Sequence, residues 1–205
     1  MNKSSFILLL FFPFLLIAQE QDFQQWSKIG VSYDLNKDLS VSLDQGIRFR
    51  ENASLPDVTF SNLSLKYDLI KKWSVAIGYR YITDFDLSQN TSASHRIYTD
   101  VNYRKKKKRW LMKNRLRYQY QEENFTLRDK VSLSYNIRKT PLEPFTTFEL
   151  FFKDSEFKKW RFTLGASYPF LKEFDIDVYY RLQQSFNTNN PKQLHILGLG
   201  MEYKF

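Results

Sequence analysis

Residues 39–50 read LSVSLDQGIRFR, and through this stretch large apolar side chains alternate with small or charged ones. The odd positions carry leucine, valine, isoleucine and phenylalanine apart from Gln45, and the even positions carry serine, aspartate, glycine and arginine. A period of two places successive side chains on opposite faces of a β-strand. The stretch therefore predicts a strand with one apolar face and one charged face.

The same alternation recurs along most of the chain, for example in residues 73–82, 127–137 and 174–183. No segment shows a convincing helical period, so the sequence predicts an all-β fold. Boundaries predicted from alternation carry an error of about two to four residues. We expect about eleven strands, near residues 25–35, 39–50, 59–69, 73–84, 94–104, 109–121, 126–137, 145–153, 159–168, 174–185 and 194–205.

The composition indicates that these strands form a membrane barrel. The chain has 205 residues, enough for one domain, and it contains no cysteine for disulfides or thiolate metal sites. Its mean hydropathy of −0.51 is low, but strands that face lipid on one side and a polar lumen on the other average to a hydrophilic composition. We predict an antiparallel up-and-down transmembrane β-barrel of about 10–12 strands.

The strand count leaves the closure of this barrel open. Bacterial single-chain barrels usually have an even number of strands, and an open sheet in lipid would leave backbone groups without partners. Either a short N-terminal piece supplies a twelfth strand, or strands two to eleven close as ten while the first strand caps or lines the wall. Residues 19–25 are too few for a full extra strand.

The N-terminus has the pattern of a secretory signal peptide. Lys3 precedes an apolar stretch from Phe6 to Ala18 that only Pro13 interrupts, and polar residues follow at once. This pattern predicts a signal peptide over residues 1–18, cleaved after Ala18, and a barrel over residues 19–205. A retained N-terminal anchor is the alternative. Together with the strands, the signal predicts export to the outer membrane of a Gram-negative bacterium.

Tyrosines near the ends of the odd-numbered strands recur once per hairpin, at intervals of 32 to 36 residues. All fall on the apolar faces, where aromatic rings favour the membrane–water interface. The turns at this end are the shorter ones, as periplasmic turns usually are. We therefore predict a periplasmic aromatic girdle of Tyr33, Tyr67, Tyr103, Tyr135, Tyr168 and Tyr203.

The last strand ends in Tyr203-Lys204-Phe205, and a terminal aromatic residue is typical of the signal that barrel-assembly machinery recognises. Tyr203 and Phe205 are the predicted signal residues. The net charge of +9 favours anionic lipid headgroups and lipopolysaccharide as neighbours, because an exported protein meets little nucleic acid. The basic run 105–109 is interpreted as a solvated turn. The sequence does not indicate an oligomeric state.

Five segments are similar to the outer-membrane barrel family named domain of unknown function 2490. They are residues 26–35, 36–50, 73–82 with its Gly-Tyr-Arg-Tyr, 95–100 and 115–119. The resemblance extends over nearly the whole chain after the signal peptide. It implies the outer membrane and a barrel fold, and it implies no activity.

The polar strand faces give the lumen charges of both signs with an excess of arginine. Two interpretations remain open: an internal network of ion pairs that fills the barrel, or an anion-preferring pore. About eight strands fill their interior with side chains and sixteen leave a wide channel, so this barrel lies between the two. The main predicted lumen charges are Asp44, Arg48, Arg50, Arg80, Arg96, Asp100, Arg115, Arg117, Arg128, Arg161 and Arg181.

A rim hydrolase of the phospholipase or lipid A deacylase type is the alternative function. The two histidines, His95 and His195, lie at the predicted external ends of their strands, where such an enzyme meets the outer leaflet. Ser94 adjoins His95, but neighbouring residues on a strand point to opposite sides and cannot form a pair. No spacing indicates a metal site, and no cofactor is predicted. A soluble periplasmic binder with an apolar lumen is a third interpretation.

Overall fold

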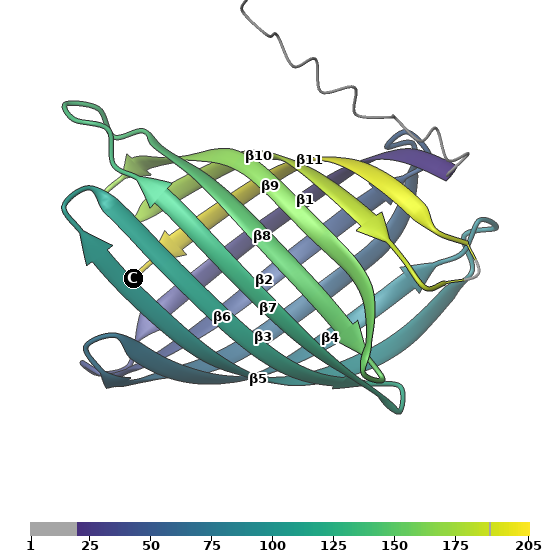
Figure 1. Cartoon of the computed structure of the whole chain (residues 1–205), viewed down its shortest axis with the longest axis horizontal. Coiled ribbons are helices and arrows are strands. Elements are labelled where there is room, and N and C mark those ends of the chain that lie inside the picture. The colour runs from purple at the N-terminus through teal and green to yellow at the C-terminus, as the bar shows by residue number, and fades with distance from the viewer. Residues whose placement is uncertain (1–19, 189) are drawn as a thin grey trace, which may run out of the picture.

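The computed structural model describes residues 20–188 and 190–205, which form one closed barrel (Figure 1). The predicted all-β class and the predicted number of eleven strands are confirmed. Within the described residues, no helix is long and apolar enough to cross a membrane. The strands are β1 (Glu20–Asp34), β2 (Leu39–Arg50), β3 (Leu55–Ile70), β4 (Trp73–Phe85), β5 (Thr91–Lys107), β6 (Trp110–Gln121), β7 (Asn124–Tyr135), β8 (Glu143–Lys153), β9 (Glu156–Leu171), β10 (Phe174–Ser185) and β11 (Lys192–Lys204).

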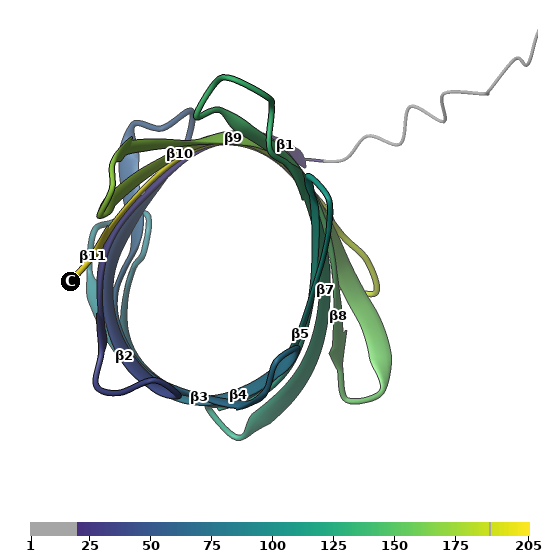
Figure 2. The same ribbon diagram turned by 90° about the vertical axis from the view of Figure 1, so that its left-hand side faces the viewer.

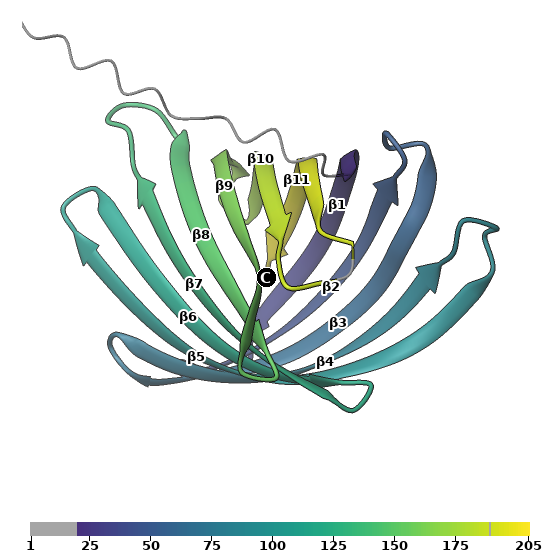
Figure 3. The same ribbon diagram turned by 45° about the vertical axis from the view of Figure 1, so that its right-hand side comes forward.

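The barrel closes through a parallel seam between its first and last strands. β1 pairs with β11 from Glu20↔Lys192 to Ser32↔Lys204, whereas all other neighbours are antiparallel. Figure 3 shows the two strands side by side, and Figure 2 shows the ring that they complete. Both predicted ways of closing the barrel are therefore wrong. An odd number of alternating strands brings two strands of the same direction together, and residues 20–24 extend β1 rather than form a twelfth strand.

The two faces of the wall differ as the alternation predicts. Large apolar side chains such as Ile29, Leu63, Ile77, Leu116 and Leu164 are exposed on the outside. Buried charged side chains such as Asp100, Arg117 and Glu149 line the lumen, which contradicts the interpretation of an apolar lumen. The apolar outside supplies the surface that a barrel presents to lipid.

One apolar cluster lies inside the barrel, against the parallel seam. Trp26 of β1 packs with Leu194 and Ile196 of β11, and all three are buried. Leu194 and Ile196 occupy positions that the alternation assigns to the polar face of the last strand. The cluster fills this side of the lumen and supports the seam from within.

Aromatic rings on the lumen face cover glycines of neighbouring strands. A Cβ at Gly78 would lie 2.1 Å from the ring of Tyr98, and one at Gly198 would lie 2.0 Å from the ring of Tyr179. Glycine is therefore required at both positions, because any side chain would overlap the ring. This close approach lets large rings line the lumen without closing it.

The six tyrosines of the predicted girdle lie toward the end of the barrel where the chain finishes, and Tyr33, Tyr67, Tyr168 and Tyr203 are exposed. Tyr103 contacts Trp73 and Tyr135 contacts Trp110, with ring centroids 4.9 and 4.7 Å apart. Phe205 contacts Tyr203, with centroids 4.7 Å apart. The predicted signal peptide, residues 1–18, lies outside the described residues.

Candidate functional site

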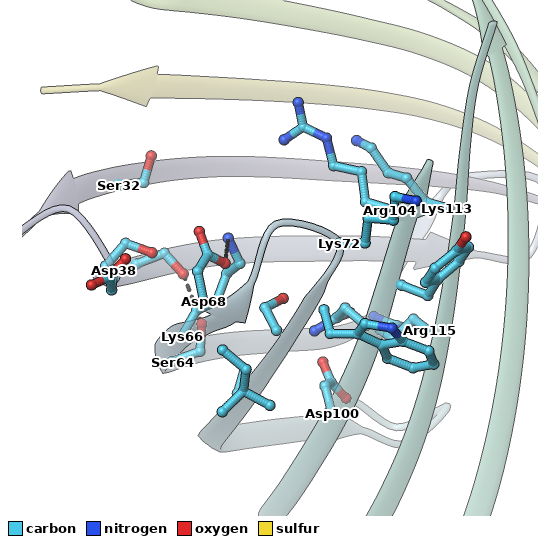
Figure 4. A pocket seen from close by; sticks show the side chains of 18 of the residues that line it. Ser32, Asp38, Ser64, Lys66, Asp68, Lys72, Asp100, Arg104, Lys113 and Arg115 are labelled. Carbon is cyan, nitrogen blue, oxygen red and sulfur yellow. Dashed lines mark hydrogen bonds and ion pairs between the residues drawn. The ribbon is translucent and has the colours of Figure 1, made fainter. Parts of the chain in front are cut away.

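Two cavities enter the lumen from its opposite mouths. The first, of about 780 Å³, opens at the end of the barrel where the tyrosines lie (Figure 4), and the second, of about 960 Å³, occupies the other half. Four residues line both cavities: Ser64, Asp100, Arg115 and Lys130. The lumen is therefore hollow from each side, and the two hollows meet at these four side chains.

The second cavity is strongly cationic. Thirteen lysine and arginine residues line it, against four aspartate and glutamate residues. The structure places ten of the eleven predicted lumen charges here, namely Asp44, Arg48, Arg80, Arg96, Asp100, Arg115, Arg117, Arg128, Arg161 and Arg181.

Arg50 is the exception and lines neither cavity. The register between β2 and β3 shifts beside it, because Asp57 of β3 is left without a partner between Val58 and Pro56. Its guanidinium lies 3.3 Å from Asp57 and donates a hydrogen bond of 2.6 Å to the carbonyl of Phe85. Arg50 lies at the end of β2, at the mouth of the barrel, and its assignment as a lumen charge stays a prediction.

Part of the arginine excess is paired with carboxylates. Glu149 accepts hydrogen bonds from Arg115 and Arg128, at 2.8 and 2.7 Å, and Arg161 lies 3.6 Å away. Arg117 donates two hydrogen bonds to Asp100. These contacts join strands β5 to β9 and form the internal ion-pair network that was one of the two interpretations.

The strand register sets several like charges directly opposite one another. The pairs are Arg80↔Arg96, Arg104↔Lys113, Arg115↔Lys130 and Arg117↔Arg128. Like charges that face each other across two strands are destabilising. Asp100 and Glu149 offset the repulsion within the last two pairs, because they bond to Arg115, Arg117 and Arg128. No carboxylate pairs with Arg80 or Arg96 in the described part of the chain.

Aromatic rings support many of the guanidinium groups. Arg48 lies 4.0 Å from the ring centroid of Trp26, Arg80 lies 4.2 Å from Phe60, and Arg117 lies 3.5 Å from Tyr98. A ring face attracts a cation and restricts its orientation. The lumen positions of Trp26, Phe60 and Tyr98 were not predicted from the sequence. The signal that could have revealed them is their position on the polar faces of their strands, next to strands that carry glycine.

The two histidines lie on the outer wall in matching surroundings. The hydroxyl of Tyr79 lies 2.6 Å from His95 Nδ1, and the hydroxyl of Tyr180 lies 2.6 Å from His195 Nδ1. Within residues 20–188 and 190–205, neither imidazole has a serine or carboxylate partner, and no acidic or histidine cluster could hold a metal. Ser94 is buried and bonds to Asp84 and Gln121. This geometry gives the rim-hydrolase hypothesis no support.

A closed barrel with an apolar outside and a charged, hollow lumen has the architecture of porin-like membrane barrels. The chain belongs to the family described as protein of unknown function (DUF2490), whose profile matches residues 23–195.

Solved porin structures share the fold. The KdgM porin in complex with disordered oligogalacturonate is similar with a TM-score of 0.50 and 12% identity, over 81% of this chain and 91% of that one. A second structure of the KdgM porin gives a TM-score of 0.48 and 12% identity, over 80% and 89% of the chains. None of the curated proteins compared with this chain matches it significantly.

Proposed function

We propose that the chain is an integral barrel of a Gram-negative outer membrane and forms a narrow pore that prefers anionic solutes. The cationic excess of a lumen that is hollow from both mouths carries this proposal. The porin-like fold supports it. Oligogalacturonate, which accompanies the similar KdgM porin, is one example of a carboxylated solute that such a lumen would favour.

The meeting point of the two cavities would set the selectivity of the pore. Arg115 and Lys130 lie opposite each other there, and Asp100 is already engaged by Arg117. A narrow, charged passage favours counter-ions, since interactions between charges strengthen where little water screens them. An anion passing this level would meet Lys130 beside Arg115, which itself bonds to Glu149.

The membrane setting is part of the same proposal. The tyrosine girdle would face the periplasmic interface, and the opposite mouth would meet lipopolysaccharide. Tyr203 and Phe205 would present the assembly signal to the barrel-assembly machinery. Fractionation of cell membranes tests this placement, and recovery of the protein in the soluble periplasmic fraction would contradict it.

Planar-bilayer recording of the refolded protein tests the pore. We expect stepwise conductance and, under a salt gradient, a reversal potential of the sign that anion preference gives. Lys130→Glu should reduce that preference, whereas Lys139→Glu, in a turn that lines neither cavity, should leave it unchanged. An electrically silent barrel would show that the ion-pair network closes the lumen.

A further inference from the structure

The lumen arginines divide into two groups according to their partners. Arg115, Arg117, Arg128 and Arg161 contact Asp100 or Glu149. A second group has no carboxylate partner in the described residues. It consists of Arg48, Arg80, Arg96 and Arg181, which all line the second cavity. Arg181 donates a hydrogen bond to Thr163.

The partners of this second group are neutral. Arg80 donates through Nε to Asn62 Oδ1 at 3.1 Å. Arg96 donates through Nε and one Nη to Gln121 Oε1, at 2.8 and 2.5 Å. The guanidinium of Arg48 donates no hydrogen bond within the described part of the chain. Both terminal nitrogens of Arg80 and one of Arg96 therefore keep donors for another partner.

Arg48, Arg80 and Arg96 come from β2, β4 and β5, on one part of the wall. Arg80 and Arg96 are direct partners across β4 and β5. Arg48 and Arg80 both approach the ring of Phe60, at 5.6 and 4.2 Å from its centroid. Arg181 reaches Trp26, the ring on which Arg48 stacks, so a fourth cation flanks the group.

Such an arrangement is unfavourable without a counter-charge. Directly opposed like charges destabilise a sheet, and rings and carboxamides hold the guanidinium groups in place without neutralising them. Guanidinium N–H groups form a planar fork that matches the geometry of carboxylate and phosphate oxygens. A bound oxyanion would supply both the missing charge and the missing acceptors.

We propose that Arg48, Arg80 and Arg96 form a binding site for an oxyanion group, either a free oxyanion or a phosphate, sulfate or carboxylate carried by a larger solute. The inference rests on the proposed pore, because the site lies in the same lumen. Asn62 and Gln121 orient the guanidinium groups, and Phe60 positions two of them. The paired arginines around Glu149 instead maintain the wall.

Calorimetric titration of the refolded barrel in detergent micelles tests the site, with inorganic phosphate as the probe at constant ionic strength in chloride. We expect saturable binding. Arg80→Gln and Arg96→Gln should each weaken it about tenfold, the factor that corresponds to about 1.4 kcal/mol. Arg104→Gln is the matched control, since it removes an equal charge from the other cavity, and it should change the affinity less than about twofold. Heat-modifiable migration on gels establishes that each variant is folded.

A second arm with tripolyphosphate distinguishes the two sources of the oxyanion. At least about tenfold tighter binding than phosphate would assign the site to one group of a longer polyanion, and equal affinity would assign it to a free oxyanion. The site would be overturned if neither phosphate nor tripolyphosphate bound saturably. Equal losses of affinity in Arg80→Gln and Arg104→Gln would also overturn it. Conductance of the same samples in bilayers separates the two proposals, because a conducting barrel without phosphate binding keeps the pore and loses only the site.

Discussion

Arg117 donates two hydrogen bonds to Asp100, at 2.6 and 2.7 Å, and only 6% and 7% of the two side chains are exposed. The two residues are direct partners across β5 and β6. Asp100 also lies where the two cavities meet. One buried ion pair therefore joins the wall of the barrel to the narrow part of its lumen.

Replacing Asp100 by Asn should destabilise the barrel by about 3–5 kcal/mol, because a buried guanidinium loses its counter-charge. Asp175→Asn is the control, since Asp175 pairs with Lys204 at an exposed position, and exposed pairs contribute about 0–1 kcal/mol. Urea unfolding in detergent, followed by tryptophan fluorescence, measures both free energies of unfolding. Equal losses would show that the Arg117 pair has no special role.

A side chain at a covered glycine should reduce the stability of the barrel. Gly198→Ala places a methyl group against the ring of Tyr179 and should cost about 1–3 kcal/mol of stability, as overpacking does. Gly200→Ala, two residues later on the same strand, meets no atom closer than 3.4 Å and should cost less. The same unfolding experiment ranks the two variants, and the reverse order would contradict the ring-over-glycine packing.

A polar pair on the outer wall should reduce stability in a bilayer. Asp129 accepts a hydrogen bond of 2.7 Å from Asn114, and it lies between the exposed Leu127 and Val131 on β7. Replacing both residues of the pair by Leu should stabilise the barrel in vesicles by about 1–2 kcal/mol, since charges on a lipid face are unfavourable. A loss of stability would instead indicate that a protein surface covers this face.

Engineered disulfides test the parallel seam directly, because the native chain has no cysteine. Ser27 and Leu199 are register partners, so Ser27→Cys with Leu199→Cys should cross-link under mild oxidation. Ile29→Cys with Leu199→Cys is shifted by two residues along β1 and should link poorly. Mass spectrometry quantifies the bonds, and efficient linkage of the shifted pair alone would refute the register.

Alternation predicted the two faces of the wall well, because the order of apolar and polar residues within each strand shows which side chains point outward. Leu63 and Asn62 follow that pattern directly. The parallel seam could not be predicted in this way, because the residues of β1 alone do not identify β11 as the strand that pairs with it. Alternation also could not show that a bulge in β3 brings Asp57 to Arg50, 3.3 Å away.

The site was only partly predictable for a different reason. The sequence showed that arginines outnumber acids on the inner face, but it could not show which arginines would find a carboxylate. Glu149 reaches Arg115 and Arg128 because β6, β7 and β8 pair in one particular register. Arg48 and Arg80 share a ring instead, and that pairing exists only in three dimensions.

Because the number of strands is odd, the described chain starts at one mouth of the barrel and finishes at the other. β1 begins at the mouth opposite the one where β11 ends, since the two strands run in the same direction. In a bilayer, the first residues of β1 and the last residues of β11 would therefore lie at opposite surfaces. A short epitope inserted before Glu20 and another placed after Phe205 would be cleaved by proteases from opposite sides of the membrane.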